Sequence, residues 1–164
     1  MTSCSFSPLS LSDMKGVIDI FNYYISNSFA AFPTQPVPYE FFTVFLETRK
    51  HYPSVVAREP DGSIAGFGIL RPHNAMPAFA HTAEITYFIR PDCTGKGLGS
   101  RILRYLENEG KSRGISTLLA SISSLNEGSI RFHEKNGFVH CGRFRMVGEK
   151  NGVIFDTVWM QKFI

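Results

Sequence analysis

The strongest constraint on this chain is the glycine-rich segment Thr94–Ser100 (TGKGLGS), which stands between a predicted strand and a predicted helix. The strand, Ala83–Ile89, is a run of β-forming residues that ends before Pro91. The helix, Gly97–Gly110, carries its leucine and isoleucine side chains on one face. Glycines let backbone N–H groups come close to a ligand, and the start of a helix adds the positive end of its dipole. The segment therefore predicts a phosphate-binding turn, or else a tight strand–helix connection with no ligand.

Two common phosphate-binding motifs do not fit this segment. Lys96 comes too early for the GxxxxGK[ST] pattern of a P-loop, and the GxGxxG spacing of dinucleotide-binding turns is absent. The net charge is only +3, and the basic residues form no continuous run. We therefore expect a small phosphate-bearing ligand as the partner of this chain, and no nucleic acid.

The rest of the chain predicts one mixed domain. Its 164 residues suit a single domain over 1–164, and 43% hydrophobic residues argue against long disorder. The second half has the order strand, helix, strand, helix, strand, and the dipeptides Asp61-Gly62 and Asn151-Gly152 each predict a hairpin turn. Arg71–Phe79 contains two prolines and predicts a loop. This order indicates an α/β or α+β fold, a sheet with helices on both faces.

The cysteines and the start of the chain indicate a reducing compartment. Cys4, Cys93 and Cys141 are odd in number and far apart, with no CxxC pair, so neither a disulfide framework nor a zinc site is predicted. Met1–Leu11 lacks the basic start and long apolar run of a targeting segment, and no apolar stretch is long enough to span a bilayer. We expect a cytoplasmic protein that needs no metal and does not bind a membrane.

A second motif follows at Asn126–Phe138 (NEGSIRFHEKNGF). Asn126 is placed to cap the next helix, and Ser129 and His133 lie one turn apart on one of its faces. A capping asparagine and a lone histidine are, by themselves, more often structural than functional. Together with Ala83–Gly99, however, this segment resembles the motifs of the GNAT acetyltransferases, most closely the phosphinothricin and methionine sulfoximine acetyltransferase branch.

The resemblance implies a GNAT fold, a mixed and mostly antiparallel sheet opened like a V around acetyl-CoA, and a homodimer. The backbone of Tyr87, Phe88 and Ile89 would pair with the pantetheine arm, and Asn126 and Ser129 would contact the same arm. The pyrophosphate would lie on the glycine-rich segment, whose members are Thr94, Gly95, Lys96, Gly97, Leu98, Gly99 and Ser100. Thr94 is a departure, because the family usually has Arg or Gln there. Lys96 could partly replace that contact.

The reaction that the resemblance implies is acetyl transfer from acetyl-CoA to an amine, which must lose a proton before it attacks. Glu84, in an apolar strand, is the predicted general base. Without the family, a glutamate in an alternating strand would more often face solvent. His133 would lie near the thioester sulfur, either as an acid that protonates the leaving thiolate or as a second base.

The acetyl acceptor is the least constrained part of this interpretation. The branch acetylates the α-amine of amino-acid analogues, whose carboxylate needs a cationic partner. Arg71 is the candidate, or else an ordinary exposed arginine. Phe29 and Phe32 either line the acceptor pocket or belong to the core. The alternatives are a peptide N-terminal or polyamine acetyltransferase, and a non-catalytic acyl-CoA-binding domain.

Overall fold

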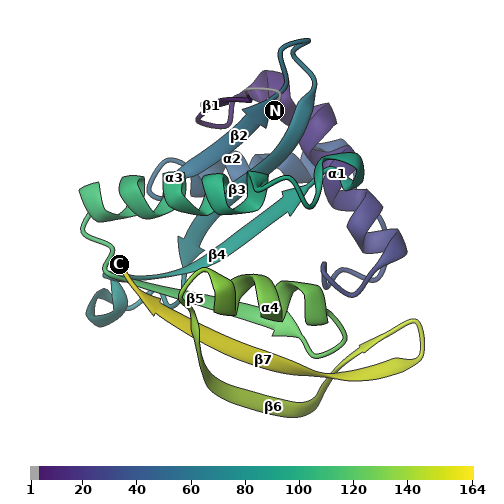
Figure 1. Cartoon of the computed structure of the whole chain (residues 1–164), viewed down its shortest axis with the longest axis vertical. Helices are drawn as coiled ribbons and strands as arrows, with labels where there is room; N and C mark the ends of the chain where they lie inside the picture. Colours follow the sequence, from purple (N-terminus) through teal and green to yellow (C-terminus); the bar gives the residue numbers. More distant parts are fainter. Residues whose placement is uncertain (1–3) are drawn as a thin grey trace.

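The computed structural model describes residues 4–164, which form one mixed sheet with helices on both faces (Figure 1). The strands are β1 (Ser5–Ser7), β2 (Ser54–Arg58), β3 (Ile64–Pro72), β4 (Thr82–Ile89), β5 (Thr117–Ser123), β6 (Val139–Lys150) and β7 (Val153–Phe163). The α-helices are α1 (Met14–Asn27), α2 (Phe42–Thr48), α3 (Leu98–Ser112) and α4 (Glu127–Lys135). Met1–Ser3, part of the start for which no targeting segment is predicted, lie outside the described residues.

The sheet opens between β4 and β5. In the order β1-β2-β3-β4-β5-β7-β6, these are the only parallel neighbours within residues 4–164. They pair over three residues, from Thr82 with Thr117 to Glu84 with Leu119, and then diverge. Beyond Glu84, β4 therefore has no strand partner on the β5 side, and Figure 1 shows the gap widening there beneath α3 and α4. The predicted mixed, mostly antiparallel fold is confirmed.

Two apolar clusters hold the helices on opposite faces of this sheet. One cluster joins α1 and α2, through residues such as Val17 and Phe42, to Phe88 of β4. The other joins α3, through residues such as Leu106, to Ile85 of the same strand. Because side chains alternate along a strand, even-numbered side chains of β4 face α1 and α2, and odd-numbered ones face α3.

The strand β3 is longer than its sequence predicts. Arg71 was expected in a loop, but it lies in β3 and pairs with Glu84 of β4, and Pro72 pairs with Ala83. Proline at the end of a strand forfeits only one hydrogen bond, so it does not stop the pairing. This extension places Arg71 and Glu84 side by side on one face of the sheet.

A short 3-10 turn, Leu11–Asp13, leads into α1. The N-cap of this turn is Ser10, whereas the N-cap position of α1 itself is Asp13. The carboxylate of Asp13 accepts a hydrogen bond of 2.7 Å from the backbone N–H of Ser10. Asp13 is thus the acidic partner of the capping box of the 3-10 turn and also the N-cap residue of α1, where its side chain makes no capping hydrogen bond.

Candidate active site

A cavity of about 750 Å³ occupies the opening between β4 and β5. Its walls come from β4, β5, the end of β3, the start of α3, one face of α4, and α1 with the loop that follows it. Most of the residues predicted to bind a ligand line it: Arg71, Tyr87, Phe88, Ile89, Thr94, Gly95, Gly97, Leu98, Gly99, Ser100, Asn126, Ser129, His133 and Phe32. Three residues that the sequence offers for the site are missing from its walls: Glu84, Lys96 and Phe29.

The glycine-rich segment forms one end of the cavity. Gly95 and Gly97 have positive φ angles of 72° and 78°, which L side chains rarely adopt. Gly97 caps α3 without a side chain, so the first N–H groups of that helix are left for a ligand. At Gly99 an added Cβ would stand 3.1 Å from the ring of Phe132, so the glycine also lets α3 and α4 approach closely.

Two of the three polar side chains of this segment, Thr94 and Lys96, form hydrogen bonds with the backbone nearby. Lys96 donates a hydrogen bond of 2.7 Å to the backbone oxygen of Asp92, and Thr94 donates one of 2.8 Å to the backbone oxygen of Pro91. Anion binding at this end of the cavity therefore rests on backbone amides, with no long side-chain donor aimed at the ligand.

The free edge of β4 forms a second wall. Its other edge is fully paired with β3, from Gly66 with Ile89 to Pro72 with Ala83. Because β5 has already diverged, the backbone of Tyr87 and Phe88 faces the cavity without a strand partner. Such an edge can pair with an extended ligand arm as it would with another strand.

Glu84 is buried in an ionic cluster beside the cavity. Its side chain is 9% exposed, and one carboxylate oxygen forms an ion pair with Arg71. The other oxygen lies 2.9 Å from Nδ1 of His73. Arg71 lines the cavity whereas Glu84 lies behind it. The carboxylate that the sequence predicts as a base therefore does not line the cavity itself, and it is paired with the arginine that the sequence predicts as a substrate ligand.

His133 and Tyr87 form a hydrogen-bonded pair on the opposite wall. Nδ1 of His133 lies 2.7 Å from the backbone oxygen of Ser129, an acceptor only, so Nδ1 carries a proton. Burial lowers the pKa of His133 to about 4, so the ring is neutral near pH 7. Nε2 is then an acceptor, and the hydroxyl of Tyr87, 2.5 Å away, donates to it. Burial also raises the pKa of Tyr87 well above its ordinary value, so its hydroxyl keeps its proton.

Asn126 has the capping role that its position predicts. Its Oδ1 accepts a hydrogen bond of 3.2 Å from the backbone N–H of Ser129, and both residues also line the cavity. The cap uses Oδ1 alone, which leaves the Nδ2 donors of Asn126 for a ligand.

Phe32 and Phe29 have different surroundings. Phe32 is 44% exposed and lines the cavity, whereas Phe29 is absent from its walls and packs against Phe155 of β7. Sequence reasoning missed the side chains of His73 and Tyr87. The alternation along β4 could have assigned Tyr87 to the face opposite Glu84.

Residues 17–138 match the sequence profile of the Acetyltransferase (GNAT) family. The chain belongs to the GNAT acetyltransferase family. The match covers both the glycine-rich segment and α4, so the predicted family and enzyme class are confirmed.

Relatives within the GNAT family span the whole fold. The chain is 30% identical to an L-methionine sulfoximine/L-methionine sulfone acetyltransferase of Pseudomonas aeruginosa, over 97% of this chain and 94% of that protein. It is also 30% identical to a phosphinothricin N-acetyltransferase of Streptomyces coelicolor, over 92% of this chain and 90% of that protein. The predicted branch of the GNAT family is confirmed by these relatives.

A solved GNAT structure has the same architecture. The phosphinothricin acetyltransferase of Sinorhizobium meliloti, in complex with acetyl-CoA, superposes with a TM-score of 0.93 at 25% identity. The match covers 100% of this chain and 89% of that one. Within residues 4–164, no helix has the length and hydrophobicity of a membrane span, and no three His, Cys, Asp or Glu side chains gather as a ligand group for a metal.

Proposed function

We propose that this chain transfers an acetyl group from acetyl-CoA to the amino group of a small amino-acid-like acceptor. The single observation that carries the proposal is the arrangement along β4. An amide cradle for phosphate lies at the carboxyl end of the strand, and the Arg71–Glu84 pair lies at its amino end. One cavity therefore reaches from a site for a nucleotide-linked thioester to a site for an ionic acceptor.

Acetyl-CoA supplies an activated thioester, and the residues present fit its parts. The positive-φ glycines and the uncapped start of α3 suit the pyrophosphate, because a side chain at Gly95 or Gly97 would strain the turn. The free edge of β4 at Tyr87 and Phe88 suits the amides of the pantetheine arm. The Nδ2 donors of Asn126 suit a carbonyl of the same arm.

Glu84 is the general base of this proposal. Its carboxylate carries two cationic or N–H partners, Arg71 and His73, and is otherwise surrounded by the sheet. Because Glu84 does not line the cavity itself, a water molecule in the cavity carries the proton from the acceptor's ammonium to the carboxylate. The acceptor nitrogen then has the lone pair with which it attacks the acetyl carbon.

His133 assists the reaction by holding a neighbouring side chain in position. Near pH 7 its Nε2 carries no proton to give, and its lone pair is occupied by the hydroxyl of Tyr87. The role that remains for His133 is to hold Tyr87 at the cavity wall. Tyr87 lines the cavity, and its hydroxyl is held by Nε2 of His133.

The charge of the cavity favours an acceptor that carries a carboxylate. Its lining includes Arg71 and Lys135 and no aspartate or glutamate. Only one donor nitrogen of Arg71 pairs with Glu84, so the guanidinium has N–H groups left for an acceptor carboxylate. Phe32 supplies apolar contact beside it. A polyamine would need acidic groups that this lining lacks. The relatives named for methionine sulfone, methionine sulfoximine and phosphinothricin support the same class of acceptor.

A panel of acceptors tests the proposal. Methionine sulfone, methionine sulfoximine and phosphinothricin are compared with spermidine and with a peptide that has a free N-terminus, by release of free CoA and by mass of the product. We expect N-acetylation of at least one amino-acid analogue with kcat/KM at least tenfold above spermidine and the peptide. Preference for spermidine or the peptide would overturn the acceptor class.

The outer face of β6 supports a homodimer as part of this proposal. The strand lies at the edge of the sheet, and four of its apolar side chains are 59–72% exposed: Val139, Phe144, Met146 and Val147. A second copy of the chain would cover this face and the open edge. Sedimentation should give a dimer for the native chain and a monomer for Phe144→Asp, and a monomeric native chain would refute the dimer.

We also place the enzyme in the cytoplasm, consistent with three free cysteines, Cys4, Cys93 and Cys141.

A further inference from the structure

Lys150 is a buried lysine that the proposed chemistry does not use. It ends β6, next to the hairpin turn at Asn151 and Gly152, and only 2% of its surface is exposed. It is the only buried lysine within residues 4–164. A long cationic side chain is rarely buried without a specific partner, because removal of the charge from water costs free energy. Its contacts therefore indicate what it does.

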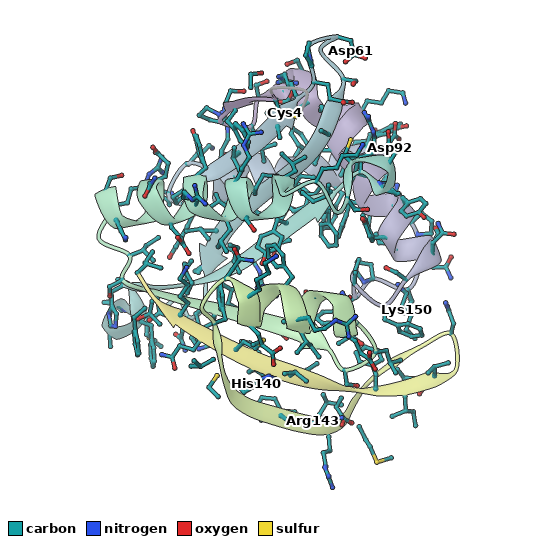
Figure 2. The ribbon with its side chains drawn as sticks, in the orientation of Figure 1. Cys4, Asp61, Asp92, His140, Arg143 and Lys150 are labelled. Carbon is teal, nitrogen blue, oxygen red and sulfur yellow. The ribbon has the colours of Figure 1, made fainter. Side chains whose placement is uncertain are left out.

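The ammonium of Lys150 binds the loop that follows α1. Nζ donates hydrogen bonds of 2.8 Å to the backbone oxygen of Ser28 and 2.9 Å to that of Ala31. No carboxylate within residues 4–164 forms an ion pair with it. Figure 2 shows Lys150 at the end of the β6–β7 hairpin, beside the loop that leaves α1. Two segments more than a hundred residues apart are thus joined by one side chain.

Phe155 makes a second connection between the same segments. Its ring stacks on Phe32 with centroids 5.9 Å apart and meets Phe29 edge-on at 5.8 Å. Phe155 pairs in register with Gly148 on β6, and an added Cβ there would stand 2.3 Å from the ring. The glycine therefore lets the Phe155 ring lie across β6, where it meets the loop.

The loop that these residues hold is one wall of the cavity. Ala30, Ala31, Phe32 and Pro33 line it, whereas Lys150 and Phe155 do not. Ala30 and Ala31 pack in the apolar cluster of α1 and α2, on the face of the sheet that also carries Arg71 and Glu84. Lys150 thus cannot bind an acceptor directly, but it fixes the backbone that presents Phe32 to the acceptor.

We propose that Lys150 is a positioning residue that fixes the acceptor wall, residues 28–33, and thereby sets the affinity of the enzyme for its amine acceptor. The proposal rests on the proposed function for the identity of the acceptor side. Loss of the Nζ donors leaves two carbonyls of the wall without their partner, so the wall moves while the acetyl-CoA cradle stays in place.

Steady-state kinetics separates this role from a general structural one. Lys150→Met keeps the length of the side chain and removes the donors, and we expect it to raise the KM for the amine at least tenfold. The KM for acetyl-CoA should stay within twofold of the native value. Gly148→Ala should act in the same direction, because it displaces Phe155. Equal changes in both KM values, or no change in either, would overturn the proposal.

A matched control and a readout that needs no acceptor complete the test. Lys162→Met removes a lysine that is only partly buried and that pairs with Glu107 instead of the loop. Amide hydrogen exchange of residues 28–33 should accelerate in Lys150→Met and Gly148→Ala, but not in Lys162→Met. Accelerated exchange in a chain that acetylates no amine would uphold the positioning role and refute the proposed function. Unchanged exchange in Lys150→Met would refute the positioning role.

Discussion

Arg71 and Glu84 stand opposite each other on β3 and β4, and the guanidinium of Arg71 forms an ion pair with the carboxylate of Glu84. This pair joins two roles that the sequence assigns separately, an anchor for the acceptor and a base for its proton. In the proposed function, an acceptor carboxylate bound to the free donors of Arg71 would bring its own α-amine close to Glu84. The pair would then couple recognition of the acceptor to its activation.

Glu84→Gln should remove the base with little change of shape. Positioned acid–base groups contribute about 100-fold to 10,000-fold in rate, so kcat/KM for the amine should fall by an amount in that range. The affinity for acetyl-CoA, measured by calorimetry, should be unchanged, because Glu84 does not line the cavity. His133→Phe should lower kcat/KM for the amine by a smaller factor than Glu84→Gln does. The reverse order, with Glu84→Gln near full rate and His133→Phe nearly inactive, would make His133 the base.

His133 should also leave a signature in the stability of the fold. Burial lowers its pKa from 6.5 to about 4, so the unfolded chain takes up a proton between these values that the folded chain does not. Stability is therefore lost as the pH falls through this window. Relative to His133→Gln, which does not titrate, the free energy of unfolding should fall by about 3 kcal/mol from pH 7 to pH 4. If denaturant titrations give the same change in free energy of unfolding with pH for both proteins, His133 is not held neutral in the fold.

Gly97→Val should disrupt the amide cradle. Its φ of +78° strains any L side chain, and the added carbons would point into the cavity that Gly97 lines. The KM for acetyl-CoA should rise at least tenfold. Gly114→Val is the matched control, because Gly114 follows the other end of α3 with a φ of +80° and does not line the cavity. An equal rise of KM in both variants would mean that strain, and not the cradle, is responsible.

Thr94→Arg should strengthen the hold on the pyrophosphate. Thr94 lines the cavity, but its hydroxyl donates to the backbone oxygen of Pro91. The ammonium of Lys96 donates to the backbone oxygen of Asp92. A guanidinium at this position adds a charge-assisted bond worth about 1 kcal/mol, or about fivefold in the Kd of CoA. The gain should shrink as salt is added. An unchanged Kd at low salt would show that the amides already satisfy the phosphates.

The parts of this structure that the sequence predicted are set by local signals. The glycine-rich turn, the cap at Asn126 and the hairpin at Asn151-Gly152 each depend on residues within a few positions of one another. The V-shaped opening and the cofactor wall followed from the family resemblance, because divergence of β4 from β5 has no signal of its own in the sequence.

The parts that were missed depend on contacts between distant segments. Arg71 belongs to β3 only because β4 continues alongside it. The neutral state of His133 follows from its burial, and its ring packs against Tyr87, which lies 46 residues earlier in the chain. Lys150 ends a strand whose other side chains are mostly exposed, and its burial follows from the approach of a loop 119 and 122 residues away.

The most direct test of the whole account is the initial rate of CoA release by the native enzyme, measured with acetyl-CoA alone and then with methionine sulfone added. We expect release only when the amine is present, with one N-acetylated product formed for each CoA released and a loss of at least 100-fold in Glu84→Gln. Tight binding of acetyl-CoA with no amine-dependent release, across the amino-acid analogues as well as spermidine and the peptide, would contradict it and leave a binding domain in place of an enzyme.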